Sequence, residues 1–304
     1  MRILFIGESY LPQLCGMTAV TRYLAEGLVS RGHKVGIATQ SHFDNDKNVE
    51  ILNGVEINRF RIRRNLLKYP VGELKLFIDF VLRSEYDVYI FECIGSLTSD
   101  ILMPYIDKIR GLKILHTHGN WFKTMHPFVI RQNLKFTLGN TYNYLRLWFQ
   151  NLYSYPKFIK SFDEVIILSS VSSDKEIVCE NACKYEVLDN AADDIFFEEY
   201  NKVEPLNYPL QTKYNKYIIS IANFQKVKNQ MLMVRSYYES DLTDVSLVMI
   251  GSKKNDYYQL VADYVSKQSK KYPRKDVVML TGVERKKIPN ILKFNYRRLA
   301  QEYL

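Results

Sequence analysis

The sequence predicts an α/β protein of two Rossmann-like, doubly wound halves. The chain opens with a short apolar strand at residues 2–7, then a loop, a helix to about residue 31 and a second strand at 34–39. This order predicts parallel strands joined by a right-handed crossover. Another apolar strand, at 217–222, runs into a loop and a helix and so opens a second half of the same kind. The 304 residues suffice for two medium domains.

The first half is predicted to continue with more parallel strands. Its first helix would be capped by Thr18 and would end at Gly32, since glycine commonly follows the last turn of a helix. Further strands are expected at residues 55–60, 87–91, 113–117, 164–168 and 185–188. We therefore assign residues 1–190 to an amino-terminal domain and residues 191–304 to a carboxyl-terminal domain.

The second half is expected to be incomplete. Its strands are predicted at 217–222, 246–251 and 276–281, with helices at about 228–239 and 255–269. A doubly wound fold usually has five or six strands, yet residues 294–304 read as a polar helical tail. We expect this domain to be truncated and less stable than the first.

Composition favours a cytoplasmic globular protein. No apolar run approaches the roughly 18 residues that cross a bilayer, and residues 2–7 are too few for a secretory signal. The four cysteines are Cys15, Cys93, Cys179 and Cys183. They show neither a CxxC pair nor a disulfide framework, so buried free thiols are expected.

The net charge of +9 is unevenly spread. One basic cluster comprises Arg59, Arg61, Arg63, Arg64 and Lys68. Residues 121–162 contain six Lys or Arg residues, no acidic residue and many aromatic residues. Such a stretch is typical either of core helices with a solvated basic face or of contact with an anionic membrane surface. Nucleic acid is not an expected partner, because no nucleic-acid-binding motif is present.

Two loops are candidate phosphate sites. A strand that ends at a helix amino terminus offers unpaired N–H groups and the positive end of the helix dipole, and Lys228 adds a charge there. In the loop after the first strand, Gly16 allows close approach of a ligand to the backbone. This loop is not GxGxxG, and the second strand ends in Gln40 instead of an acidic residue. Both features argue against a nicotinamide or flavin enzyme.

Two further motifs carry possible chemistry. Alternation places His116 and His118 on the same side of a strand end, where ligands bind in such folds. With no third ligand close in sequence, we expect one histidine to contact substrate and the other to pack. Asp44 and Asp46 form a DxD pattern, but their polar loop favours a solvated turn over a metal site.

Taken together, these segments resemble retaining glycosyltransferases of family 4, which have the GT-B architecture. The resemblance extends from residue 1 to about residue 292. It is carried by Met1–Gly7, the Pro12 to Gly16 loop, Leu24–Val35, His118-Gly119, Val187–Asp193, Ile221–Asn229, Leu247–Gly251 and Met279–Val283. The segment Val187–Asp193 is similar to the family's "IPNGVD", with Asp189 for proline and Ala191 for glycine, and Ile221–Asn229 is similar to "GRLxxxKG".

The resemblance implies transfer of a sugar from a nucleotide diphosphate sugar to an acceptor hydroxyl with retention, in surface polysaccharide or glycolipid synthesis. It implies no metal or other cofactor. Gly16, Asn223 and Lys228 would bind the donor phosphates, Val283 would lie at the nucleobase, and His118 would be the catalytic contact to the sugar. The acceptor would lie on the first domain, and residues 121–162 would meet the membrane and a lipid-linked acceptor.

Two departures from the family pattern leave three interpretations open. Asn223 stands where the family has an arginine, and no acidic motif follows residue 292. The chain is expected to be an active transferase, a truncated inactive relative, or a nucleotide-sugar-binding or membrane-surface protein without catalysis.

Overall fold

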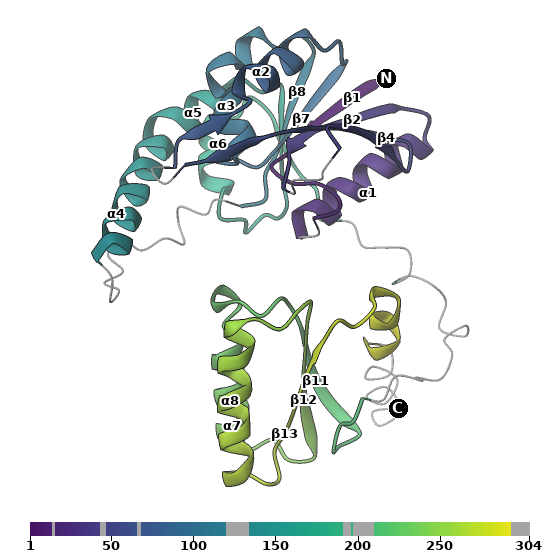
Figure 1. Cartoon of the computed structure of the whole chain (residues 1–304), viewed down its shortest axis with the longest axis vertical. Coiled ribbons are helices and arrows are strands. Elements are labelled where there is room, and N and C mark those ends of the chain that lie inside the picture. The colour runs from purple at the N-terminus through teal and green to yellow at the C-terminus, as the bar shows by residue number, and fades with distance from the viewer. Residues whose placement is uncertain are drawn as a thin grey trace. The chain divides into compact units, whose positions relative to one another are not determined.

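The computed structural model describes residues 1–13, 16–42, 47–65, 68–119, 134–190, 196 and 210–292 (Figure 1). The chain divides into two compact units, Met1–Ala191 and Ala192–Leu304. Each unit contains a sheet of mainly parallel strands with helices against it, which confirms the predicted α/β class.

Unit 1 contains an eight-stranded sheet in the order β10-β9-β8-β7-β1-β2-β4-β3. All neighbouring strands are parallel except β3 and β4. The strands are β1 (Arg2–Ile6), β2 (Lys34–Gln40), β3 (Val49–Leu52), β4 (Val55–Phe60), β7 (Val88–Glu92), β8 (Leu112–His116), β9 (Glu164–Ile167) and β10 (Tyr185–Val187). A separate antiparallel pair joins β5 (Ile62–Arg64) to β6 (Pro70–Gly72).

The helices of unit 1 cover both faces of this sheet. They are α1 (Gly16–Ser30), α2 (Leu74–Arg83), α3 (Leu97–Leu102), η1 (Met103–Lys108), α4 (Leu134–Phe149), the π-helical turn η3 (Gln150–Ser154), α5 (Tyr155–Lys160) and α6 (Lys175–Asn181). Helix α1 begins at Gly16, so the predicted cap at Thr18 is wrong. Thr18 is buried inside the helix, and its hydroxyl lies 3.1 Å from Ser9 Oγ.

The core of unit 1 forms two apolar layers. Leu4 and Ile6 of β1 pack into one layer, whereas the alternate residues Ile3 and Phe5 pack into the other. This burial on both faces is what parallel strands with helices on each side require. Polar side chains that could contact a ligand are therefore expected at the ends of the strands and in the loops that follow them.

Unit 2 contains a three-stranded parallel sheet in the order β11-β12-β13. The elements are β11 (Lys216–Ile221), η6 (Lys226–Lys228), α7 (Gln230–Glu239), β12 (Val245–Gly251), α8 (Asp256–Lys271), β13 (Asp276–Thr281) and η7 (Arg285–Lys287). Helix α8 begins after Asn255, whose side chain accepts a hydrogen bond from Tyr258 N at 2.8 Å. Figure 1 shows α7 and α8 on one face of this sheet.

Part of the basic cluster serves the fold. Arg59 is buried and pairs with Glu50 at 2.6 Å. Arg64 pairs with Asp100 at 2.8 Å. These two arginines stabilise unit 1 internally and do not add to a basic surface.

The prediction of buried thiols is wrong for Cys179 and Cys183, which are exposed, whereas Cys93 is buried. Helix α6 buries Val178, which turns the next residue, Cys179, toward solvent. Cys15 lies outside the described residues. No helix in the described ranges is long and apolar enough to cross a membrane.

Candidate functional site

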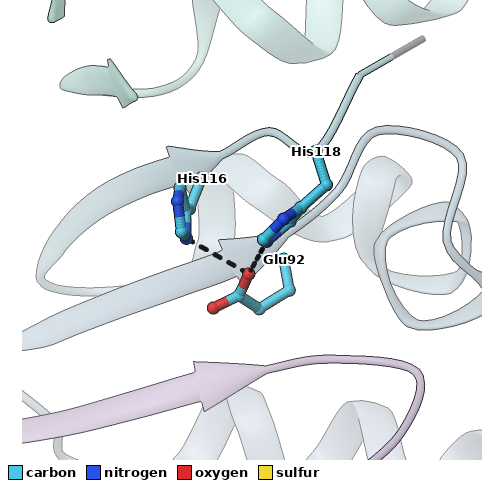
Figure 2. A group of neighbouring side chains, drawn as sticks. All are labelled: Glu92, His116 and His118. Atoms are coloured by element: carbon cyan, nitrogen blue, oxygen red, sulfur yellow. Dashed lines mark hydrogen bonds and ion pairs between the residues drawn. The ribbon is translucent and has the colours of Figure 1, made fainter. Parts of the chain in front are cut away.

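Three ionisable side chains meet at the carboxyl-terminal edge of the first sheet. Strands β7 and β8 are parallel neighbours, and their register places Glu92 beside His116. His118 lies two residues beyond His116, so its side chain is on the same side, as alternation predicts. Figure 2 shows the two imidazoles pointing toward the Glu92 carboxylate.

Both histidines approach one oxygen of Glu92. Oε2 of Glu92 lies 2.6 Å from Nε2 of His118, a short hydrogen bond, and 3.3 Å from Nδ1 of His116, an ion-pair distance. The imidazole centroids are 4.5 Å apart. The side chain of Glu92 is 1% exposed, that of His116 is 3% exposed, and that of His118 is 10% exposed.

The cluster holds a buried negative charge. Burial alone would raise the pKa of Glu92, but contacts from His116 and His118 outweigh it and hold the pKa of this carboxyl below its ordinary value. Oε1 of Glu92 is buried without a hydrogen-bond partner among the described residues. The carboxylate therefore has bonding capacity that its protein neighbours leave unused.

The backbone around the cluster is fixed by hydrogen bonds. Cys93 has a left-handed φ of 71°, and its N–H donates to the carbonyl of His116 at 2.9 Å. Ser99 Oγ donates to the carbonyl of Cys93 at 2.9 Å. Gly119 has a φ of 94°, and its N–H donates to the buried Asp174 at 3.2 Å. Glycine suits position 119 because a residue with a Cβ would be strained at this left-handed φ.

Sequence reasoning identified the two histidines but missed Glu92. The predicted strand stopped at residue 91, one position short of the carboxylate. A usable signal was present, because Glu92 ends the apolar run Val88–Phe91 at the edge where ligands bind. Glu92 and His116 are 24 positions apart in the sequence, so the sequence alone did not reveal the contact.

Gly16 lies at the same edge of unit 1. It is the first residue of α1 and is exposed. The next residue, Met17, contacts the neighbour of Glu92, with 3.1 Å between Met17 Sδ and Cys93 Sγ. No described atom lies within 4 Å of a Cβ built on Gly16, and its φ is not in the left-handed region. Neither the backbone nor described neighbours require glycine here.

The predicted residues of unit 2 lie in loops at the carboxyl-terminal edge of its own sheet. Asn223 Oδ1 accepts a hydrogen bond from Ser252 N at 3.3 Å, and the Ser252 carbonyl accepts one from Gly282 N at 3.1 Å. The loops after β11, β12 and β13 are thereby tied together. Val283 follows Gly282 and packs partly buried against a second core of the unit, around Tyr217 and Val248.

Lys228 is exposed and ends the short turn η6. Asn229, with a left-handed φ of 49°, separates it from α7, so Lys228 precedes the helix instead of forming its first turn. Its position beside the start of α7 keeps it at the edge where phosphate was predicted. Asp44 and Asp46 lie outside the described residues.

The comparisons with known proteins identify the fold. No family model and no curated protein sequence matches the chain. Solved structures do match it over both units. Sucrose-phosphate synthase from Thermosynechococcus elongatus has a TM-score of 0.61 at 12% identity, covering 96% of this chain and 73% of its own.

Two further solved structures that match the chain contain bound nucleotides. HepE from Anabaena, in complex with UDP and glucose, has a TM-score of 0.60 at 13% identity, covering 96% of this chain and 71% of its own. The catalytic domain of starch synthase IV from Arabidopsis thaliana, bound to ADP and acarbose, has a TM-score of 0.56 at 11% identity. It covers 97% of this chain and 76% of its own. The chain therefore has the two-unit α/β fold of GT-B glycosyltransferases.

Proposed function

We propose that this protein is a retaining glycosyltransferase of the family 4 type, which transfers a sugar from a nucleotide diphosphate sugar to an acceptor hydroxyl. The observation that carries the proposal is the likeness over 96% of the chain to HepE bound to UDP and glucose. A similar E. coli structure is bound with UDP-2-fluoro glucose. We further propose a role in surface polysaccharide or glycolipid synthesis.

Unit 2 is proposed to bind the donor. The leaving diphosphate gains charge as the glycosidic bond breaks, and groups already oriented toward that charge lower the barrier. Lys228 supplies a positive charge, and the amino terminus of α7 supplies the positive end of its dipole. Asn223 contributes an exposed amide in place of a second cation. We propose that Val283 contacts the nucleobase.

Unit 1 is proposed to carry the acceptor side and the catalytic contact to the sugar. His118 is the most accessible member of the Glu92–His116–His118 cluster, so its imidazole is the one that a sugar hydroxyl can reach. Glu92 fixes the orientation of His118 through the 2.6 Å hydrogen bond. Gly16 leaves room for the donor phosphates at the start of α1.

Calorimetry with UDP, ADP and GDP tests the donor proposal directly. The full chain should bind at least one of these nucleotides with a one-to-one stoichiometry, and the corresponding nucleoside more weakly because it lacks the phosphates. If none of the three nucleotides binds, the proposed donor site is wrong.

A second part of the proposal concerns the membrane. Figure 1 shows α4 extending away from the sheet of unit 1. Along α4 and η3, one exposed stripe comprises Tyr142, Leu145, Trp148, Phe149, Leu152 and Tyr153. Lys157 and Lys160 follow and are also exposed. Apolar and aromatic residues next to lysines are typical of a helix that lies on an anionic bilayer surface.

The stripe refines the sequence-based picture of residues 121–162. Tyr155, Phe158 and Phe162 are buried in the core of unit 1, and Arg146 lies 3.6 Å from Asp100. Residues 121–133 and the side chains of 134–140 lie outside the described parts. We propose that the exposed stripe rests on the membrane and brings unit 1 to a lipid-linked acceptor.

A further inference from the structure

The Glu92–His116–His118 cluster has the composition of a metal site. One carboxylate oxygen and two imidazole nitrogens all lie within 4.8 Å of one another. Two imidazoles and a carboxylate form a donor set that first-row transition ions accept readily. Figure 2 shows the three side chains converging from the ends of two adjacent strands. We propose that this cluster binds a divalent transition-metal ion, with Zn²⁺ as the probe of choice.

The distances fit an ion after a small adjustment. Zinc lies about 2.0–2.1 Å from such donors, so a tetrahedral arrangement holds the donor atoms roughly 3.4 Å apart. Oε2 of Glu92 is 3.3 Å from Nδ1 of His116 and 2.6 Å from Nε2 of His118. Of these two distances, only the second has to widen, by under about 1 Å. His118 lies beyond the end of β8 and is the least buried of the three, so it can make this adjustment.

Two buried atoms in the cluster lack hydrogen-bond partners. Oε1 of Glu92 and Nδ1 of His116 are both unsatisfied among the described residues. Unpaired buried polar atoms are uncommon in native proteins and cost free energy. Without an ion, Nδ1 of His116 has only its 3.3 Å contact with Oε2 of Glu92, whereas an ion would accept a lone pair from Nδ1 of His116 and from a carboxylate oxygen of Glu92.

Hydrogen bonds fix the backbone that carries the two histidines. The hydrogen bond from Cys93 N fixes the backbone of His116, and the one from Gly119 N to Asp174 fixes the backbone next to His118. Groups that hold the first ligands in place strengthen metal binding. The expectation of no metal rested on the family resemblance and on the lack of a third ligand close in sequence to the two histidines. Glu92 is that ligand.

Metal binding is compatible with the proposed role of His118. Neither the hydrogen bond to Glu92 nor the proposed metal bond uses Nδ1 of His118. An imidazole that binds an ion through one nitrogen donates a hydrogen bond from the other. Metal binding is measured without any sugar donor or acceptor. A chain that binds no metal would therefore contradict the metal site alone, and a chain that transfers no sugar would contradict the proposed function alone.

The test is a titration of the full chain, after dialysis against EDTA, with ZnCl₂ by calorimetry and with CoCl₂ by visible absorption. We expect one equivalent of each ion to bind and the Co²⁺ complex to show the intense d–d bands of a four-coordinate site. His118→Asn and Glu92→Gln should each weaken Zn²⁺ binding by about tenfold or more. His33→Gln, which changes a histidine outside the cluster, should bind like the wild type.

Three results would overturn the proposal. One is no Zn²⁺ or Co²⁺ binding by the wild type, and another is wild-type affinity in a folded His118→Asn variant. The third is sulfur in the first shell of bound zinc by X-ray absorption, which would assign the ion to the cysteines. If Glu92→Gln does not fold, His118→Asn and the wild-type absorption data still decide the question.

Discussion

At the residue scale, Lys228 is proposed to supply the positive charge that binds the donor phosphates. It is exposed, beside the start of α7, and no ion pair joins it to another described residue. A cation in that position is available to a diphosphate, whereas Arg59 is already held by Glu50. Many exposed lysines bind no ligand. The effect of replacing Lys228 therefore has to be compared with the effect of replacing an exposed lysine elsewhere in unit 2.

Lys228→Ala should weaken nucleotide diphosphate binding by roughly 1.5–3 kcal/mol, since a charge-assisted contact is lost. This corresponds to about a 10- to 150-fold rise in Kd by calorimetry. Lys270→Ala is the matched control, because Lys270 is exposed in the last turn of α8, away from the strand ends that carry Lys228. An equal change in Kd for the two variants would show that Lys228 does not bind the donor phosphates.

Gly16→Ala separates a binding role from a folding role. A Cβ at this position meets no described atom within 4 Å, so the melting temperature should stay the same or rise slightly. If donor phosphates approach this backbone, the added methyl should raise the Kd for nucleotide diphosphate by on the order of tenfold. Thermal unfolding and calorimetry on one preparation measure both. Unchanged affinity in a folded variant would contradict the assignment.

Gly251→Ala is the contrasting glycine. A Cβ there would lie 2.5 Å from Cδ2 of Phe224, a fully buried ring. The overpacked core of unit 2 should cost about 1–3 kcal/mol of unfolding free energy. Denaturant unfolding followed by a probe in unit 2 measures this cost, and a stability equal to that of the wild type would show that the ring can move aside.

At the element scale, the exposed stripe on α4 and η3 predicts membrane binding. The chain should bind anionic vesicles more tightly than neutral ones, and less tightly at high salt, because surface charge attraction is screened. Trp148→Ser combined with Phe149→Ser should weaken vesicle binding, since both side chains are about half exposed on the stripe. Leu76→Ser, at another exposed apolar residue of unit 1, is the control.

Sedimentation with vesicles measures this binding. Equal partitioning to neutral and anionic vesicles would disprove the electrostatic part of the membrane proposal. Unchanged binding by the double variant would disprove the role of the stripe.

The strands also show which parts of the fold could be predicted from the sequence. The parallel strands β7, β8, β11, β12 and β13 were all predicted within a residue or two, because each is a short run of mainly apolar residues. The edge strand β3 was missed because its residues are largely exposed and lack such a run. Glu92 was missed for a different reason: only the pairing of β7 with β8 places it beside His116.

At the scale of the whole molecule, the two units differ in the size of the sheet on which each hydrophobic core is built. Unit 1 builds its cores on eight strands, and unit 2 builds its described cores on three. Strand β11 is an edge of the described sheet, with Ile218 and Ile221 more than two fifths exposed. Fewer buried apolar contacts mean lower local stability.

Hydrogen exchange should therefore show faster exchange in β11 and β13 than in β1 and β7. Saturating nucleotide diphosphate should slow exchange in unit 2, because a ligand that binds only the folded state stabilises it. Equal protection of the two sheets without nucleotide would contradict the predicted difference in stability.

The most direct test of the central claim is sugar transfer by the purified full chain. The chain is incubated with UDP-, ADP- and GDP-sugars, with water and alkyl glycosides as acceptors, and NMR follows nucleotide diphosphate release and the product anomer. We expect at least one donor to be consumed with retained anomeric configuration, and we expect Lys228→Ala and His118→Ala to slow this consumption. Release of no nucleotide diphosphate from any donor, or a product of inverted configuration, would contradict it.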